Sequence, residues 1–234
     1  MIRIGKLALI LLFVAQTPYL FGQGKVRRWT CPEQKGPVLE RNVCNPNIEL
    51  DSTTIDRLVI TAFSATEVPG GVSLSFNSGS DILYTFKPAS MNLRDVLNSI
   101  GTAAPNYEWK EDNGVINLRP INDYSLLDTR IAEFNVEKAT KGELLAALID
   151  SSEFKEALAE NKLSEPRHLF FGGLQSSAPP NRYSVHLKNT TIREVLNEIV
   201  RQNSHSTWLY QELNSDSTEQ NKRYYRLYFL IDHF

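Results

Sequence analysis

The sequence predicts an α+β fold made of two tandem small modules, each with two helices packed on a short mixed sheet. Three observations predict it: a gapless internal repeat, helical apolar spacing behind cap residues, and short alternating strands around each helix. The repeat pairs NLRDVLNSIGTAAPNYEW (92–109) with TIREVLNEIVRQNSHSTW (191–208). Its identical pairs are Arg94/Arg193, Val96/Val195, Leu97/Leu196, Asn98/Asn197, Ile100/Ile199 and Trp109/Trp208. Internal similarity over this length indicates a duplicated structural unit.

Each copy of the repeat is expected to begin with a capped amphipathic helix. The apolar positions follow the spacing i, i+3, i+4, i+7, which places them on one face of a helix. In the first copy Asn92 is followed three residues later by Asp95, and in the second Thr191 is followed by Glu194. A cap residue followed by an acid at this distance is the start signal of a helix.

Short strands flank both helices. The segments before them alternate between apolar and polar residues, and the segments after them carry the two tryptophans of the repeat. In the first copy the dipeptide Asn113-Gly114 predicts a tight hairpin, whereas the second copy has a longer polar loop over 214–221,. The expected strands are 83–86, 107–109 and 115–118 in the first copy, and 183–187, 207–210 and 224–231 in the second.

A weaker helical pattern precedes each copy, starting at Thr54 in the first half and at Thr140 in the second. We therefore expect two separate modules. The predicted organisation is a signal peptide over 1–24, a disulfide-tied segment over 25–44, a first module over 45–120, a linker over 121–130 and a second module over 131–234. Two glycine pairs, Gly70-Gly71 and Gly172-Gly173, are interpreted as turns, with close approach to a ligand as the alternative,.

The N-terminus has the features of an export signal. Arg3 and Lys6 precede the apolar run Leu7–Ala15, and Gly22-Gln23-Gly24 offers a small-x-small cleavage pattern. A run this short does not cross a bilayer core, which needs about 20 apolar residues. The alternative is a buried N-terminal helix. We expect a periplasmic or secreted protein with no membrane span after cleavage.

Cys31 and Cys44 are the two cysteines of the chain. In an oxidising compartment two cysteines this close predict a disulfide that closes a small loop. The alternative is a pair of free thiols. A metal site is not expected, because His or acidic partners at ligand spacing are missing from the sequence around them.

The segment 48–120 resembles the N-terminal short domain of secretins and TonB-dependent receptors. The resemblance is carried by IELDSTTIDRLVITAFSATEVPGGVSL and by YTFKPASMNLRDVLNSIGTAAPNYEWKEDNGVINLRP, with a looser echo over 183–232. It implies a periplasmic α/β module that docks on other proteins in outer-membrane machines. We expect two diverged copies of this module without the barrel that follows it in the family.

The sequence contains no motif of catalysis or cofactor binding, including metalloprotease, hydrolase, Walker-type and dinucleotide patterns,. The formal net charge is −2, and loss of Arg3 and Lys6 with the signal peptide leaves about −4,. A mildly acidic chain without a basic stripe argues against nucleic acid or anionic membrane surfaces as partners. We expect no enzyme, no metal and no cofactor, and no pocket with two convergent ionisable groups.

Aromatic residues are the best candidates for a binding surface. Tyr107 and Trp109 share one face of a predicted strand, as do Trp208 and Tyr210, and Tyr225 lies on the final strand,. One interpretation, which we favour, makes the two tryptophans core residues over the helix face. The other places part of this set at the surface, as a platform for a glycan, an apolar ligand or a protein.

The function expected from these observations is that of a protein-interaction module of the cell envelope, whose partner is another envelope protein. Short sheets expose edges that accept a further strand. The alternative is a periplasmic ligand- or glycan-binding protein that uses an aromatic surface between the two copies. An enzyme of unrecognised type and a purely structural domain are the remaining possibilities.

Overall fold

The computed structural model describes residues 36–43, 50–75, 82–121, 126–164, 181–203, 206–214 and 223–231. The fold is α+β, as the sequence predicts. The first half contains a 3-10 turn η1 (Val38–Glu40), α1 (Ile55–Thr66), β1 (Gly70–Ser75), α2 (Leu93–Ala103), β2 (Tyr107–Asp112) and β3 (Val115–Pro120). The second half contains η2 (Leu126–Asp128), β4 (Arg130–Ala139), α3 (Lys141–Asp150), α4 (Ser152–Glu160), β5 (Leu163–Ser164), β6 (Tyr183–Thr191), α5 (Ile192–Arg201), β7 (Ser206–Asn214) and β8 (Arg223–Ile231).

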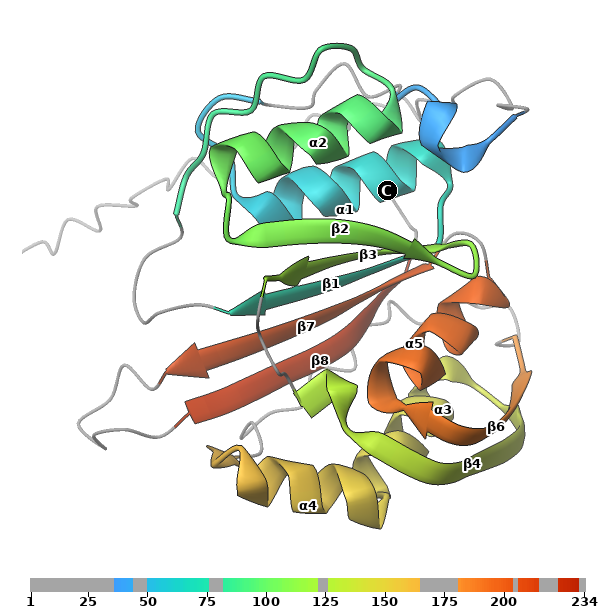
Figure 1. Cartoon of the computed structure of the whole chain (residues 1–234). Coiled ribbons are helices and arrows are strands. Elements are labelled where there is room, and N and C mark those ends of the chain that lie inside the picture. The colour runs from blue at the N-terminus through green and yellow to red at the C-terminus, as the bar shows by residue number, and fades with distance from the viewer. Residues whose placement is uncertain are drawn as a thin grey trace, which may run out of the picture.

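The centre of the molecule is a mixed six-stranded sheet with the order β2-β3-β1-β7-β8-β5 (Figure 1). β2 and β3 form an antiparallel hairpin, and so do β7 and β8. β1 is parallel to β3 in the first half, and β5 is parallel to β8 in the second. The strands β4 and β6 form a separate antiparallel pair.

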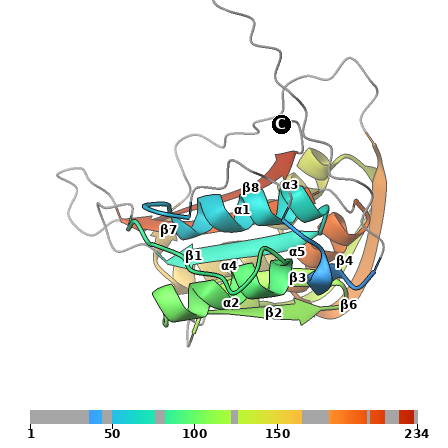
Figure 2. The same ribbon diagram turned by 90° about the horizontal axis from the view of Figure 1, so that it is seen from above.

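Helices cover both faces of this sheet. α1 and α2 lie over one face, whereas α3, α4 and α5 lie on the other side (Figures 1 and 2). Two buried apolar clusters match these layers. The first cluster joins α1 and α2 to β1 and β3 and includes Leu209 of β7. The second joins the remaining helices to Trp208, Tyr210 and Tyr225, and it includes Val115 of β3.

The helix starts of the repeat are confirmed. The backbone N–H of Asp95 donates to Oδ1 of Asn92 at 2.8 Å, which satisfies one of the free amides in the first turn of α2,. At α5, Thr191 and Glu194 form a complete capping box: Glu194 N–H donates to Thr191 Oγ1 at 3.2 Å and Thr191 N–H donates to Glu194 Oε2 at 2.6 Å,. The helices expected after Thr54 and Thr140 are also present.

The two halves share one sheet instead of having the two separate short sheets that the sequence predicts. β1 of the first half pairs in parallel with β7 of the second over the six residues from Gly70 to Ser75. We call this pairing the β1–β7 seam. Strand partners far apart in the sequence are selected by edge complementarity, which local patterns do not reveal.

The predicted linker over 121–130 is also corrected. Its described part contains η2 and the first residue of β4, and Leu126 and Leu127 are fully buried in the second apolar cluster. Two adjacent leucines gain most by burial against α5, so this segment belongs to the core. The predicted signal peptide, Cys31 and Cys44 lie outside the described residues, as does the pair Gly172-Gly173.

Candidate functional site

The two tryptophans of the repeat make the same hydrogen bond in the two halves. Nε1 of Trp208 donates to Oδ1 of Asn197 on α5 at 2.9 Å, and Nε1 of Trp109 donates to Oδ1 of Asn98 on α2 at 3.1 Å. Each asparagine holds the indole against the helix that precedes its strand. The local geometry of the two sites is therefore equivalent.

The environments of these tryptophans differ because of what lies beside each strand. Trp208 is completely buried, and its indole crosses Gly71 of the neighbouring strand β1. A β-carbon built on Gly71 would overlap the six-membered ring of Trp208. Trp109 is only partly buried, and no described strand pairs with the outer side of β2. Trp109 thus occupies, at an edge that no described strand covers, the position that Trp208 occupies at the seam.

The backbone of β2 has N–H and C=O groups along this edge that lack a partner among the described residues. The hairpin register places Glu111 opposite Ile116 and Trp109 opposite Leu118. Ile116 N–H donates away from β2, to the carbonyl of Pro69 at 3.2 Å, so Glu111 and Ile116 form a non-hydrogen-bonded pair,. Because the two kinds of pair alternate, the N–H and C=O groups of Trp109 and Glu111 both point outward. Such a row of groups is a template for a further strand.

Charged side chains lie along the edge of β2. Glu108 is paired with Nζ of Lys110 at 3.0 Å and with the guanidinium of Arg119 at 2.9 Å. Glu111 and Asp112 are exposed and make no ion pair among the described residues. The far half of this edge therefore carries two exposed carboxylates that form no ion pair with a described residue.

Stability at acid pH is expected to depend on Glu108. The Lys110 ammonium, and then the Arg119 guanidinium, hold the pKa of this carboxyl below its ordinary value of 4.5, although desolvation opposes them,. A depressed folded-state pKa gives stability that is present above pH 4.5 and is lost as the pH falls through the folded value,. Urea titrations should show a smaller acid decline for Glu108→Gln than for the wild type. Equal declines in the two proteins would contradict this assignment.

The structure places four of the five aromatic candidates in the interior. Trp208, Tyr210 and Tyr225 are at most 1% exposed, and Tyr107 is 6% exposed. They do not form a platform, because strands and helices of the shared sheet cover both of its faces. The interpretation as core residues is confirmed for Trp208, and it holds only in part for Trp109. Trp109 alone of the five is only partly buried.

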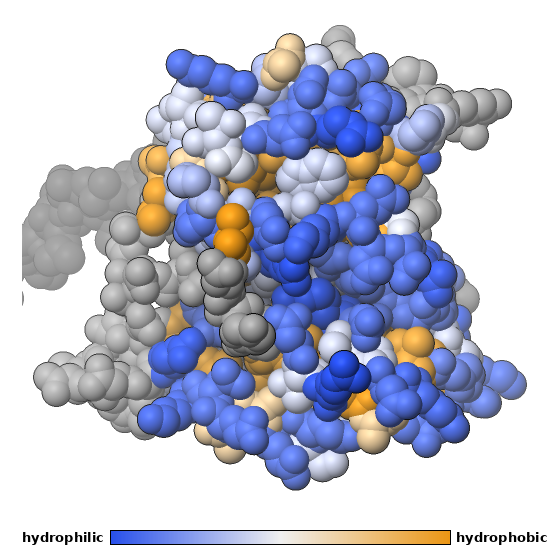
Figure 3. Space-filling view, in the orientation of Figure 1, coloured by the Kyte–Doolittle hydropathy of each residue, from blue (hydrophilic) through white to orange (hydrophobic). Residues whose placement is uncertain are grey.

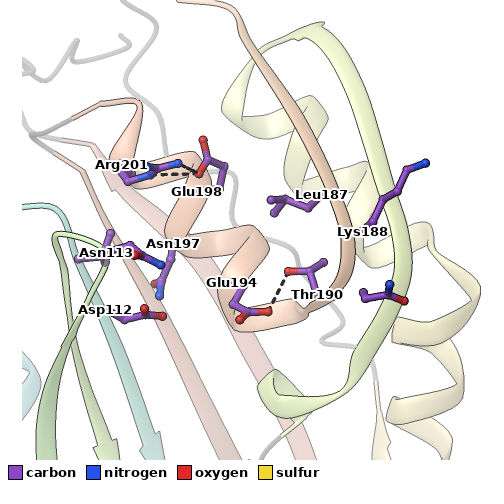
Figure 4. Close-up of a pocket in the computed structure, with 11 residues that line it drawn as sticks. Asp112, Asn113, Leu187, Lys188, Thr190, Glu194, Asn197, Glu198 and Arg201 are labelled. Carbon is purple, nitrogen blue, oxygen red and sulfur yellow. Dashed lines mark hydrogen bonds and ion pairs between the residues drawn. The ribbon is translucent and has the colours of Figure 1, made fainter.

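A polar pocket of about 440 Å³ lies between the two halves (Figure 4). It is bounded by the β2–β3 turn on one side and by α5 and the end of β6 on the other. Asn197 extends from α5 toward Asp112 and Asn113 of the turn (Figure 4). No aromatic side chain is among its described lining residues, so this pocket is not the aromatic cleft proposed as the alternative from the sequence.

Ionisable groups do line this pocket, which corrects the expectation that no such pocket exists. They are Asp112, Lys188, Glu194, Glu198 and Arg201. Local structure uses two of the acids: Glu194 accepts from Thr190 Oγ1 at 2.9 Å as well as from the cap amide, and Glu198 pairs with Arg201. Both glutamates of the pocket are thus engaged by groups of α5 and β6.

The surface around these sites is mainly hydrophilic. In the orientation of Figure 1, apolar side chains show in separate places and not as one continuous patch (Figure 3). Among the described residues the large exposed apolar side chains are Ile82, Leu83, Met91 and Ile121. The described part of the chain contains no group of three His, Cys, Asp or Glu side chains that could hold a metal ion. No described helix is long and apolar enough to cross a membrane.

Comparison of the chain with protein-family models, with curated proteins and with solved structures gives no significant match.

Sequence reasoning did not find the seam, although one signal for it was present. The prediction of a turn at Gly70-Gly71 is wrong, because both residues begin the strand β1. Their missing β-carbons make room for Phe63 of α1 on one face and for Trp208 on the other. A glycine inside a strand indicates the close approach of another group, here the indole of the adjacent strand.

Proposed function

We propose that this chain is an extracytoplasmic protein-interaction module of the cell envelope, and that the free edge of β2 is its docking site. The observation that carries this proposal is the partly exposed Trp109 on an open strand edge. Its counterpart Trp208 is buried because a strand covers the equivalent edge. An edge strand with an aromatic side chain poised beside it is suited to strand addition.

The second part of the proposal is that the chain consists of two copies of one module, joined edge to edge. The pairings of the two halves support it: β3 lies between β2 and β1 in the first, as β8 lies between β7 and β5 in the second. Both halves have one antiparallel and one parallel pair in this order. On this interpretation the β1–β7 seam is the same kind of strand addition, formed between the two copies within one chain.

An extracytoplasmic location is part of the proposal. It rests on the basic start and apolar run of the first 24 residues, and on the resemblance to the periplasmic short domain of secretins and TonB-dependent receptors,. That resemblance also suggests a partner in the envelope.

Site-specific photo-cross-linking in the envelope of the source cells tests this function. A photoreactive phenylalanine analogue at Asp112, at the end of β2, should give a discrete adduct with another protein. The same analogue at Glu156, which is exposed on α4, should not. Glu111→Pro should abolish the adduct because it removes an outward N–H, whereas Glu111→Ala keeps that N–H and should preserve it. Adducts that are the same at both positions, or that survive Glu111→Pro, would rule the β2 edge out.

A further inference from the structure

We infer that the β2 edge accepts a strand of another protein that runs parallel to β2, has glycine opposite Trp109 and has basic residues opposite Glu111 and Asp112. This inference rests on the proposed function and specifies the chemistry of the partner. The β1–β7 seam supplies its template, because β7 and β2 occupy equivalent places in the two halves.

The direction follows from the seam. β1 is parallel to β7, with Gly71 opposite Trp208 and Ser73 opposite Tyr210. Trp109 and Glu111 are the residues of β2 at the places of Trp208 and Tyr210, and their backbone groups point outward,. A strand docked in the same register as β1 runs from beside Glu108 to beside Asn113. Its residues on the indole side correspond to Gly71 and Ser73.

The glycine requirement follows from the position of the indole. The hydrogen bond to Asn98 holds Trp109 as the bond to Asn197 holds Trp208. At the seam a β-carbon on Gly71 would overlap the ring. A strand that covers Trp109 meets the same restriction, so only glycine fits opposite the ring without displacing it.

The need for basic residues in the partner strand follows from the negative charge at the end of the β2 edge. Glu108 is already neutralised by Lys110 and Arg119, which leaves the exposed carboxylates of Glu111 and Asp112 at the end of the edge. Strand residues that lie directly opposite one another interact, and like charges there are destabilising. Lysine or arginine at these two places therefore favours docking, whereas an acidic strand is disfavoured by like-charge repulsion.

Among the described strands, a second copy of this chain offers none that fits the description. β1 has the required glycine, but β3 and β7 occupy both of its edges, and its sequence GGVSLS has no basic residue. β5 lies at the other end of the sheet with one open edge, but it consists of only Leu163 and Ser164. None of the described strands is a free, glycine-containing basic strand, and we take the partner to be a different protein.

A peptide titration of the full chain tests the inference. The probe is the capped peptide Gly-Gly-Val-Lys-Lys-Ser, in which the second glycine faces Trp109 and the lysines face Glu111 and Asp112. Binding, followed by tryptophan fluorescence and acrylamide quenching, should protect Trp109. Replacing the second glycine by alanine, or both lysines by glutamate, should weaken binding at least about tenfold. Glu111→Pro in the protein should also abolish it, whereas Glu111→Ala should weaken it only moderately.

The direction is tested with a nitroxide at either end of the peptide. The N-terminal label should broaden the NMR amide signal of Tyr107, and the C-terminal label that of Asp112. The reverse pattern, equal binding of the alanine peptide, or no binding of the probe would overturn this inference. The cross-linking at Asp112 is independent of the peptide. An adduct there in spite of a failed peptide would leave the β2 edge as a docking site and remove only the partner chemistry.

Discussion

Replacing Trp208 by alanine is expected to lower the free energy of unfolding by about 4 kcal/mol, whereas Trp109→Ala should lower it by about 1–2 kcal/mol. The two residues are equivalent in the repeat and make the same hydrogen bond to an asparagine. Trp208 is fully buried at the centre of the shared sheet, so its removal leaves a cavity and an unpaired Asn197 Oδ1,. Trp109 is partly exposed at an edge, where solvent fills the vacated space.

Urea unfolding followed by circular dichroism measures both changes. Since Trp208→Ala can fail to fold, Trp208→Phe serves as a milder variant and should lose about 1–2 kcal/mol. The matched variant Trp109→Phe should change stability by less than that. Equal losses at the two positions would show that the edge of β2 is covered as fully as the seam, and would contradict an open docking edge.

The helices and the hairpin of this fold are readable from the sequence because each depends on local chemistry. Thr191 and Glu194 form the predicted capping box, and the same kind of pattern marks the start of α2. Asn113 and Gly114 form the predicted two-residue turn, with φ angles of +50° and +81°,. In each case the determining residues lie within a few positions of the element that they define.

The docking edge cannot be predicted from the sequence in the same way. Trp109 and Trp208 have nearly the same neighbours in sequence and make the same local hydrogen bond, yet one is partly exposed and the other is buried. The difference comes from β1, which pairs with β7 and leaves β2 open. Whether two distant strands pair here depends on small residues in one strand lying beside a large aromatic side chain in the other. The only local trace of that choice is the glycine pair at the start of β1.

The seam also explains why the predicted modules are not separate. β1 contributes Val72 and Leu74 to the cluster under α1, while Gly71 and Ser73 face the other side. Leu209 of β7 lies in the cluster of the first half, so each half completes the core of the other. An apolar pattern in the sequence predicts that such residues are buried. It does not show which half of the chain supplies the helix that covers them.

Gly71→Ala is expected to destabilise the protein by about 3 kcal/mol. The added methyl group would overlap the Trp208 indole, and β1 cannot move away because β3 and β7 hold it on both sides. The matched control is Gly101→Ala on the exposed face of α2. A β-carbon there meets nothing within 4 Å, so this substitution should stabilise the protein by about 0.5–1 kcal/mol through helix propensity,.

A double-mutant cycle separates this overlap from any general cost of alanine in a strand. In a Trp208→Leu background the ring is gone, so adding Gly71→Ala should cost much less than it does in the wild type. The coupling between the two positions should be about 2 kcal/mol. Strictly additive losses would mean that the indole does not impose the glycine. Because Trp109 is held by the equivalent hydrogen bond, that outcome would also remove the reason to expect glycine in a strand docked on β2.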